Sequence, residues 1–266
     1  MKVAIIGCGN MGMAFARSFL QYDLVKKEDL LLVEKSQERS EALRGAKEGM
    51  VVSTINSQIG DYELIILSVK PQDFYSVQEE LRAVIQPQQV VLSIMAGIPM
   101  TKIQEVLNHQ LVVRAMPNTP AMLGMGITGF TAAPAVDAPK LRKVENLINA
   151  TGRSVYLEDE SMIDAVTALS GSGPAYFYYL VKHMIEAGKQ MGFDEGMASL
   201  LVKQTMLGSY HLINNAEKGL DDLIKAVASK GGTTEAALKT FEESHLPEGL
   251  INGILAAERR AKELSK

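Results

Sequence analysis

The chain has 266 residues, of which 47% are hydrophobic and 22% charged, and its formal net charge is -4. This composition is typical of a globular protein with room for a large core and two domains. The basic residues are dispersed, and the densest cluster, residues 258–263, is interrupted by acids, so no nucleic-acid partner is predicted.

The N-terminus combines a short strand, a glycine-rich turn and a helix. Residues 3–6 are apolar and lead directly into Gly7, Gly9 and Gly12, which are spaced as G-x-G-x-x-G. Bulky side chains then recur at helical spacing over residues 10–20. In this order the pattern predicts a dinucleotide site, because backbone N–H groups at the helix start can bind a pyrophosphate.

The G-x-G-x-x-G spacing alone is weak evidence for a dinucleotide site, because residues 124–129 have the same spacing. No helix is expected after this second copy, so we predict a turn leading into a strand there. For the first copy, the alternative is a purely structural glycine turn.

Cys8, the only cysteine, lies inside the first turn. A single cysteine excludes an intramolecular disulfide and favours a reducing compartment, so a cytoplasmic protein is predicted. We interpret Cys8 as a small residue in a crowded turn rather than as a redox-sensitive thiol. No membrane span or targeting segment is predicted.

The first 155 or so residues alternate between strand-like and helix-like segments, which predicts a parallel doubly wound sheet of the Rossmann type. Further buried strands are expected at residues 30–34, 64–69, 90–94 and 111–114, and added edge strands at 128–132 and 153–157. Helices are expected at residues 36–48, 74–85 and 101–108.

Beyond residue 160 the pattern becomes helical. Helices are expected at residues 175–191, 198–214, 220–228, 234–243 and 247–264, with a joining helix around 160–169. The predicted architecture is therefore an α/β dinucleotide-binding domain, residues 1–158, followed by an all-α domain, residues 159–266.

Ligands of such sheets bind beyond the carboxyl ends of the strands. Glu34 ends the second strand about 20 residues after Gly12, where an acid can bind the ribose 2′-hydroxyl of NAD. Lys35 and Arg39 can instead neutralise a 2′-phosphate, so both cofactors remain open, as does a merely solvated charge cluster. Loops at residues 68–72, 93–97 and 116–120 are further candidates, with ordinary turn chemistry as the alternative.

In the helical half, residues 169–176 and 228–235 are turns rich in glycine and hydroxyl residues that enter helices. Ser229, Thr233 and Thr234 surround backbone N–H groups in the second turn, which suits a small carboxylate, although helix capping alone is the alternative. The four histidines, His109, His183, His211 and His245, lie far apart, so no metal site is predicted.

Together these segments resemble pyrroline-5-carboxylate reductase across essentially the whole chain. The similar segments are GCGNMG, SVKPQ, MAG, MPNTP, DAVTALSGSGPAY and ASKGGTTEAAL, of which SGSGPAY and GGTT are the specific ones. The resemblance implies hydride transfer from NADPH or NADH to the C5=N bond of 1-pyrroline-5-carboxylate, giving L-proline.

The resemblance also implies residue roles. The pyrophosphate is assigned to Ile6, Gly7, Cys8, Gly9, Asn10 and Met11, with Gly12 completing the turn. The adenosine end is assigned to Lys35 and its ribose to Asn56. The nicotinamide side is assigned to Val69, Lys70, Pro71, Ala96 and Gly97, and Ser68 is a further cofactor-binding residue. Substrate binding is assigned to Glu217, Ser229, Gly232, Thr233 and Thr234, with the Thr234 hydroxyl as the catalytic group at the ring nitrogen.

Two residues depart from the resemblance. Lys230 stands where the family commonly has a proline, and Glu34 is unexpected because many relatives prefer NADPH. The resemblance further implies an intertwined homodimer that can assemble into a decamer. The long apolar helices fit this, because they offer more apolar surface than a peripheral domain usually needs. The residues concerned are Phe177, Leu180, Val181, Met184 and Ile185, and the alternative for them is a buried monomer core.

Two other hypotheses remain open from the sequence. One is a related NAD(P)-dependent reductase acting on another cyclic imine or a small oxo acid. The other is a non-catalytic dinucleotide-sensing or assembly protein, against which the presence of Thr234, Glu217 and an intact glycine turn argues.

Overall fold

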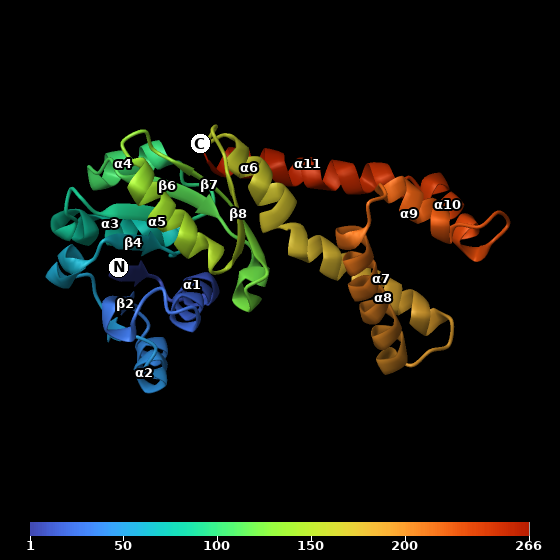
Figure 1. Ribbon diagram of the computed structural model, residues 1–266, viewed down its shortest axis with the longest axis horizontal. Coiled ribbons are helices and arrows are strands. Elements are labelled where there is room, and N and C mark those ends of the chain that lie inside the picture. Colours follow the sequence, from blue (N-terminus) through green and yellow to red (C-terminus); the bar gives the residue numbers. More distant parts are fainter. Residues whose placement is uncertain (266) are drawn as a thin grey trace. The chain divides into compact units, whose positions relative to one another are not determined.

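This computed structural model describes residues 1–265 and is drawn in Figure 1. Contacts divide the chain into two compact units. The first unit contains Met1–Pro174 together with the end of the chain from Ala257 onward, and the second contains Ala175–Ala256. Residues 159–174 thus pack with the sheet, beyond the predicted boundary at residue 158, because the helix α6 (Met162–Val166) contacts two of its strands.

Eight strands form the sheet of the first unit. They are β1 (Val3–Ile6), β2 (Leu30–Val33), β3 (Met50–Val52), β4 (Leu64–Leu67), β5 (Val90–Ser93), β6 (Val112–Met116), β7 (Gly126–Ala132) and β8 (Gly152–Tyr156). Their order is β3-β2-β1-β4-β5-β6-β7-β8. The predicted doubly wound, Rossmann-type sheet is confirmed, and β1, β2, β4 and β5 are buried at every position.

The sheet is mixed rather than wholly parallel, which corrects the prediction. Six strands run parallel, but β7 pairs with β6 antiparallel, and β8 pairs with β7 parallel. The connection between β6 and β7 holds only the short 3-10 helix Thr119–Leu123 and a turn. A connection without a long crossover can join antiparallel strands but not parallel ones. The second copy of the glycine spacing, residues 124–129, begins in a turn and leads into β7, as predicted.

Helices cover both faces of this sheet (Figure 1). They are α1 (Asn10–Gln21), α2 (Gln37–Ala46), α3 (Pro71–Val84), α4 (Met100–Leu107), α5 (Ala138–Asn149) and α6, and a π-helical turn at Thr167–Gly171 follows α6. Short 3-10 helices occupy Lys27–Asp29 and Ser57–Asp61. Contacts join α3 to α4 and α1 to α5, in line with right-handed crossovers that place the two pairs on opposite faces.

The second unit is helical, as predicted. Its elements are α7 (Gly173–Gln190), α8 (Glu195–Asn215), α9 (Leu220–Val227), α10 (Thr233–Glu243) and most of α11 (Leu246–Leu264). Between residues 175 and 256, Ala198 is the only residue that is buried. Phe177 is 62% exposed and Met184 52% exposed, so their apolar side chains are not a core within this chain. A surface this apolar is typical of an interface with another protein.

None of the helices within residues 1–265 has the length and apolar character needed to cross a membrane.

Candidate functional site

The glycine turn after β1 packs directly onto the loop that follows β4. Gly7 has a φ of +93°, and a Cβ there would lie 2.8 Å from the carbonyl oxygen of Ser68. A Cβ on Gly12 would collide with the carbonyl oxygen of Gly7 and lie 3.1 Å from Ser68 Oγ. Only glycine fits at these two positions, so the backbone of the turn stays uncovered by side chains.

The start of α1 points unpaired backbone donors toward this turn. The first hydrogen bond of the α1 ladder runs from Met13 N–H to Gly9 O, at 2.9 Å. The N–H groups of Asn10, Met11 and Gly12 therefore precede the ladder and have no acceptor within the helix. Such a helix start, fused to a side-chain-free turn, fits a pyrophosphate. The residues present thus suit the dinucleotide that the sequence predicts.

A cavity of about 300 Å³ opens beside the turn. It brings together eight of the predicted cofactor residues: Ile6, Gly7, Gly9, Glu34, Lys35, Ser68, Val69 and Lys70. Its other lining residues are Val33, Arg39, Ser53, Thr54, Ile55, Asp73, Ser76, Val77 and Glu80. Of these, residues 53–55 directly follow β3, a strand that is not predicted from the sequence. Because candidate residues are sought after the ends of strands, predicting β3 would have identified residues 53–55 as candidates.

Glu34 is a buried carboxylate among the residues that line this cavity, which also include Asp73 and Glu80. Its side chain is buried, with Oε2 accepting a hydrogen bond from Cys8 N–H at 3.2 Å and Oε1 accepting one from Ser36 N–H at 2.9 Å. Lys35 Nζ lies 3.3 Å from Asp73 Oδ1. The Glu34 carboxylate is therefore fixed against the glycine turn, whereas Lys35 pairs with a carboxylate of α3.

The Cys8 thiol stays protonated at neutral pH. Burial raises its pKa to about 12, and the nearby Glu34 carboxylate adds to the increase while Arg39 opposes it. Reactive cysteines need a lowered pKa and exposure, and Cys8 has neither. Its environment supports the interpretation of a small residue in a crowded turn.

The remaining predicted cofactor residues lie outside the 300 Å³ cavity. Asn10 and Cys8 face a neighbouring hollow, and Pro71 begins α3. Asn56 Oδ1 accepts a hydrogen bond from Gln58 N–H at 2.9 Å, so this side chain caps the following 3-10 helix. Ala96 and Gly97 lie between β5 and α4. The proposed roles of these residues remain predictions.

Four of the predicted substrate residues, Ser229, Gly232, Thr233 and Thr234, lie in a second turn, within the helical unit. Gly231 has a φ of +73°, and its N–H donates to Glu235 Oε2 at 2.6 Å. The ladder of α10 begins with Ala236 N–H bonding to Gly232 O, so the N–H groups of Thr233 and Thr234 precede it. The turn is therefore a second cluster of backbone donors at a helix start.

Thr234 also lines an apolar cavity of about 410 Å³ formed by α8, α9 and α10. Glu217 lies exposed in the connection between α8 and α9 and does not line it, and Lys230 is also exposed. The structure thus brings Thr234 to a cavity but leaves Glu217 at the surface of the chain.

Comparison with known proteins identifies the family to which the chain belongs. Residues 160–264 match the family described as pyrroline-5-carboxylate reductase dimerisation, and residues 2–97 match NADP oxidoreductase coenzyme F420-dependent. Pyrroline-5-carboxylate reductase of Pseudomonas aeruginosa is 35% identical over 266 residues, covering 100% of this chain and 97% of that protein. The chain belongs to the pyrroline-5-carboxylate reductase family.

Other pyrroline-5-carboxylate reductases agree over the same length. That of Haemophilus influenzae is 33% identical, over 98% of this chain and 97% of that protein. The solved structure from Coxiella burnetii has a TM-score of 0.89 and 30% identity, covering 100% of this chain and 98% of that one. The Plasmodium falciparum pyrroline carboxylate reductase, solved with NADP bound, has a TM-score of 0.90 and 26% identity, with coverages of 100% and 98%.

Membership in this family confirms the predicted resemblance and the predicted class of enzyme, an NAD(P)-dependent oxidoreductase. The match of the helical half to a dimerisation family supports an oligomer, in keeping with its exposed apolar helices.

Proposed function

We propose that the chain reduces 1-pyrroline-5-carboxylate to L-proline with a reduced nicotinamide dinucleotide. The observation that carries this is a pair of donor-rich helix starts, at α1 and at α10, in a chain of the pyrroline-5-carboxylate reductase family. When bound, the nicotinamide supplies a hydride. The first helix start binds the pyrophosphate, and the second binds the substrate carboxylate.

The substrate end acts by binding and by screening charge. The Thr233 and Thr234 N–H groups and the Ser229 hydroxyl bind the carboxylate, with Gly232 keeping the turn open. The Thr234 hydroxyl hydrogen-bonds the ring nitrogen. Reduction forms a C5–H bond and moves the C=N electron pair to nitrogen, so a protonated ring nitrogen is the better acceptor. Glu217 is assigned to that positive charge by the family resemblance alone, since it lies at the surface of this chain and not in the Thr234 cavity. No strong general base is needed.

The cofactor end holds the nicotinamide by its loops. Ser68, Val69, Lys70 and Pro71 follow β4, and Ala96 and Gly97 follow β5, so both loops lie at carboxyl ends of neighbouring parallel strands. This is where the second half of a dinucleotide lies in such sheets. Asn56 and Lys35 serve the adenosine half.

We further propose that NADH is preferred to NADPH, although both bind. The buried Glu34 carboxylate can accept a hydrogen bond from a ribose 2′-hydroxyl, but it repels a 2′-phosphate. Arg39, at the same cavity, lowers this repulsion without removing it.

Glu34→Ala is expected to shift the ratio of kcat/KM values toward NADPH by about tenfold, as removal of one nearby like charge predicts. The measurement is the oxidation of each reduced cofactor, followed at its nicotinamide absorbance, with pyrroline-5-carboxylate as substrate. Glu34→Ala also leaves the N–H groups of Cys8 and Ser36 without their acceptor, which can lower activity with both cofactors. Taking the ratio of the two kcat/KM values removes this shared loss.

Two variants isolate the charge of Glu34. Glu34→Gln retains an acceptor for these N–H groups and should give a shift of similar size. Glu38→Ala removes an exposed carboxylate from the first turn of α2 and should leave the ratio as in the wild type. An unchanged ratio in both Glu34 variants would exclude Glu34 as a specificity residue.

For the assembly, we propose a homodimer as the minimal unit, formed by the predicted helical domain from residue 159, with further association into a decamer. The exposed apolar side chains of α7 and α8 support a partner surface. The single cysteine, which excludes an intramolecular disulfide, supports a cytoplasmic location.

A further inference from the structure

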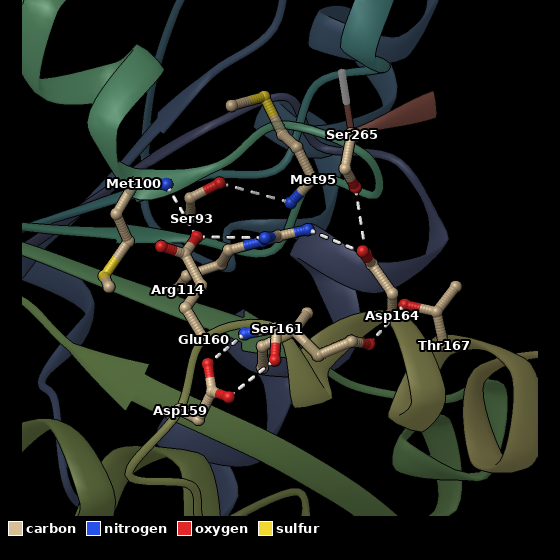
Figure 2. Close-up of polar contacts among 11 residues, drawn as sticks. Ser93, Met95, Met100, Arg114, Asp159, Glu160, Ser161, Asp164, Thr167 and Ser265 are labelled. Atoms are coloured by element: carbon tan, nitrogen blue, oxygen red, sulfur yellow. Dashed lines mark hydrogen bonds and ion pairs between the residues drawn. The ribbon is translucent and has the colours of Figure 1, made fainter. Parts of the chain in front are cut away.

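A buried arginine is linked through a carboxylate to the end of the loop assigned to the nicotinamide. Arg114, on β6, is 2% exposed. Its Nη1 lies 2.9 Å from Glu160 Oε1, and its Nη2 lies 3.5 Å from Asp164 Oδ1 (Figure 2). A buried guanidinium is costly unless it is paired, so these two carboxylates hold the position of Arg114 and are held by it.

Glu160 has a second contact that reaches the loop. The same Oε1 atom accepts a hydrogen bond from Met100 N–H at 2.7 Å (Figure 2). Met100 begins α4, whose N-cap residue is Pro99 and has no side-chain cap of its own. Glu160 therefore caps α4 from a distant segment of the chain, and its charge is favoured at the positive end of the helix.

The loop between β5 and α4 is thereby tied at both ends. At its start, Ile94 N–H bonds to Leu67 O at 3.0 Å, and Met95 N–H donates to Ser93 Oγ at 3.3 Å. At its end stands the Met100 contact with Glu160. Ser93 and Arg114 are also register partners in the sheet.

The end of α11 packs on the same loop. Gly97 has a φ of +71°, and a Cβ there would lie 3.0 Å from the carbonyl oxygen of Leu264. The next residue, Ser265, donates its hydroxyl to Asp164 Oδ1 at 2.9 Å (Figure 2). One cluster, Arg114 with Glu160 and Asp164, therefore anchors both α4 after the loop and the segment that packs on Gly97.

We propose that Arg114 and Glu160 are positioning residues for hydride transfer, which act by fixing the loop of Ala96 and Gly97 against the nicotinamide. This inference rests on the proposed function, which assigns that loop to the nicotinamide. Neither residue lines the 300 Å³ cavity, so they act through the loop rather than by touching the cofactor. If this loop is loosened, the nicotinamide ring of the cofactor is misplaced, while the adenosine half of the cofactor stays bound.

Glu160→Ala is expected to lower kcat by about tenfold or more, because small errors in the placement of reacting groups are costly. Affinity for ADP-ribose, which lacks the nicotinamide, should stay unchanged, while affinity for the complete dinucleotide falls about fivefold. Hydrogen exchange at the Met100 amide should accelerate at least about tenfold. Glu160→Gln keeps the acceptor oxygen and should restore most of kcat.

The matched control is Asp137→Ala. Asp137 Oδ1 also caps a helix of this unit, by accepting from Lys140 N–H at 2.8 Å, and the hydrogen-bond and ion-pair partner of its side chain among the described residues is Lys140, which lies outside the loop. This variant should retain the wild-type kcat and the wild-type exchange at Met100. If Glu160→Ala does not fold, Arg114→Lys takes its place, because a lysine cannot bridge both carboxylates and should give the same pattern.

Wild-type kcat in a Glu160→Ala protein whose Met100 amide exchanges freely would overturn the positioning role. So would an equal loss of affinity for ADP-ribose and for the dinucleotide, or an equal effect of Asp137→Ala. A wild-type protein that binds dinucleotide but does not reduce pyrroline-5-carboxylate would contradict the proposed function instead. The ratio of dinucleotide to ADP-ribose affinity still decides the positioning role in that case.

Discussion

Thr234→Ala is expected to lower kcat/KM for pyrroline-5-carboxylate by roughly 10- to 150-fold. This range corresponds to about 1.5–3 kcal/mol, the usual contribution of a hydrogen bond to a charged group. Thr234 lies in the first turn of α10 and lines the apolar cavity, where a lost hydrogen bond is poorly replaced by water. Dinucleotide affinity should stay unchanged. Steady-state kinetics and a cofactor titration measure the two effects.

Two variants separate the hydroxyl of Thr234 from the stability of the helix. Thr234→Ser retains the hydroxyl and should keep most of the activity. Thr240→Ala removes the hydroxyl that bonds to Ala236 O on the same helix and should leave kcat/KM unchanged. Wild-type turnover by Thr234→Ala, or an equal loss in Thr240→Ala, would remove Thr234 from the mechanism.

Gly12→Ala is expected to weaken dinucleotide binding by at least about tenfold and to lower the free energy of unfolding by about 1–3 kcal/mol, as overpacking does. The added Cβ would collide with the Gly7 carbonyl oxygen, so the start of α1 must move away from the turn. The N–H groups proposed to bind the pyrophosphate move with it. Calorimetric titration with NADH and denaturant unfolding measure these two quantities.

Gly45→Ala is the matched control in the same unit. Gly45 lies in α2, and a Cβ there meets nothing within 4 Å. Alanine should therefore raise the free energy of unfolding by about 0.5–1 kcal/mol and leave NADH affinity unchanged. Full NADH affinity in Gly12→Ala would contradict the assignment of this turn to the pyrophosphate.

The fold could be predicted where the chain's own pattern determines it. Buried strands such as β1 and β4 have apolar residues at every position because helices cover both of their faces. The edge strand β3, Met50–Val52, is apolar too, but it has only three residues and its Met50 is 44% exposed, so a run this short does not stand out in the sequence. The helix α5 is absent from the predicted elements, although Asp137 as its cap and Pro139 in its first turn are ordinary start signals.

The candidate site could be predicted where it is made of backbone. The glycine turn and the turn before α10 are local, so their spacing in the sequence indicates their geometry. The Asn56 side chain is different, because its amide oxygen bonds to the nearby Gln58 N–H, and local capping of this kind competes with a ligand. The Arg114 cluster joins segments far apart in the sequence, so no spacing indicates it.

The central claim is that the chain transfers a hydride from a reduced nicotinamide dinucleotide to C5 of pyrroline-5-carboxylate. The most direct test uses NADH and NADPH carrying deuterium at the transferable C4 position, with unlabelled pyrroline-5-carboxylate and the wild-type protein. Mass spectrometry should find proline with one deuterium, located at C5. Proline without deuterium, or no proline with either cofactor, would contradict the account.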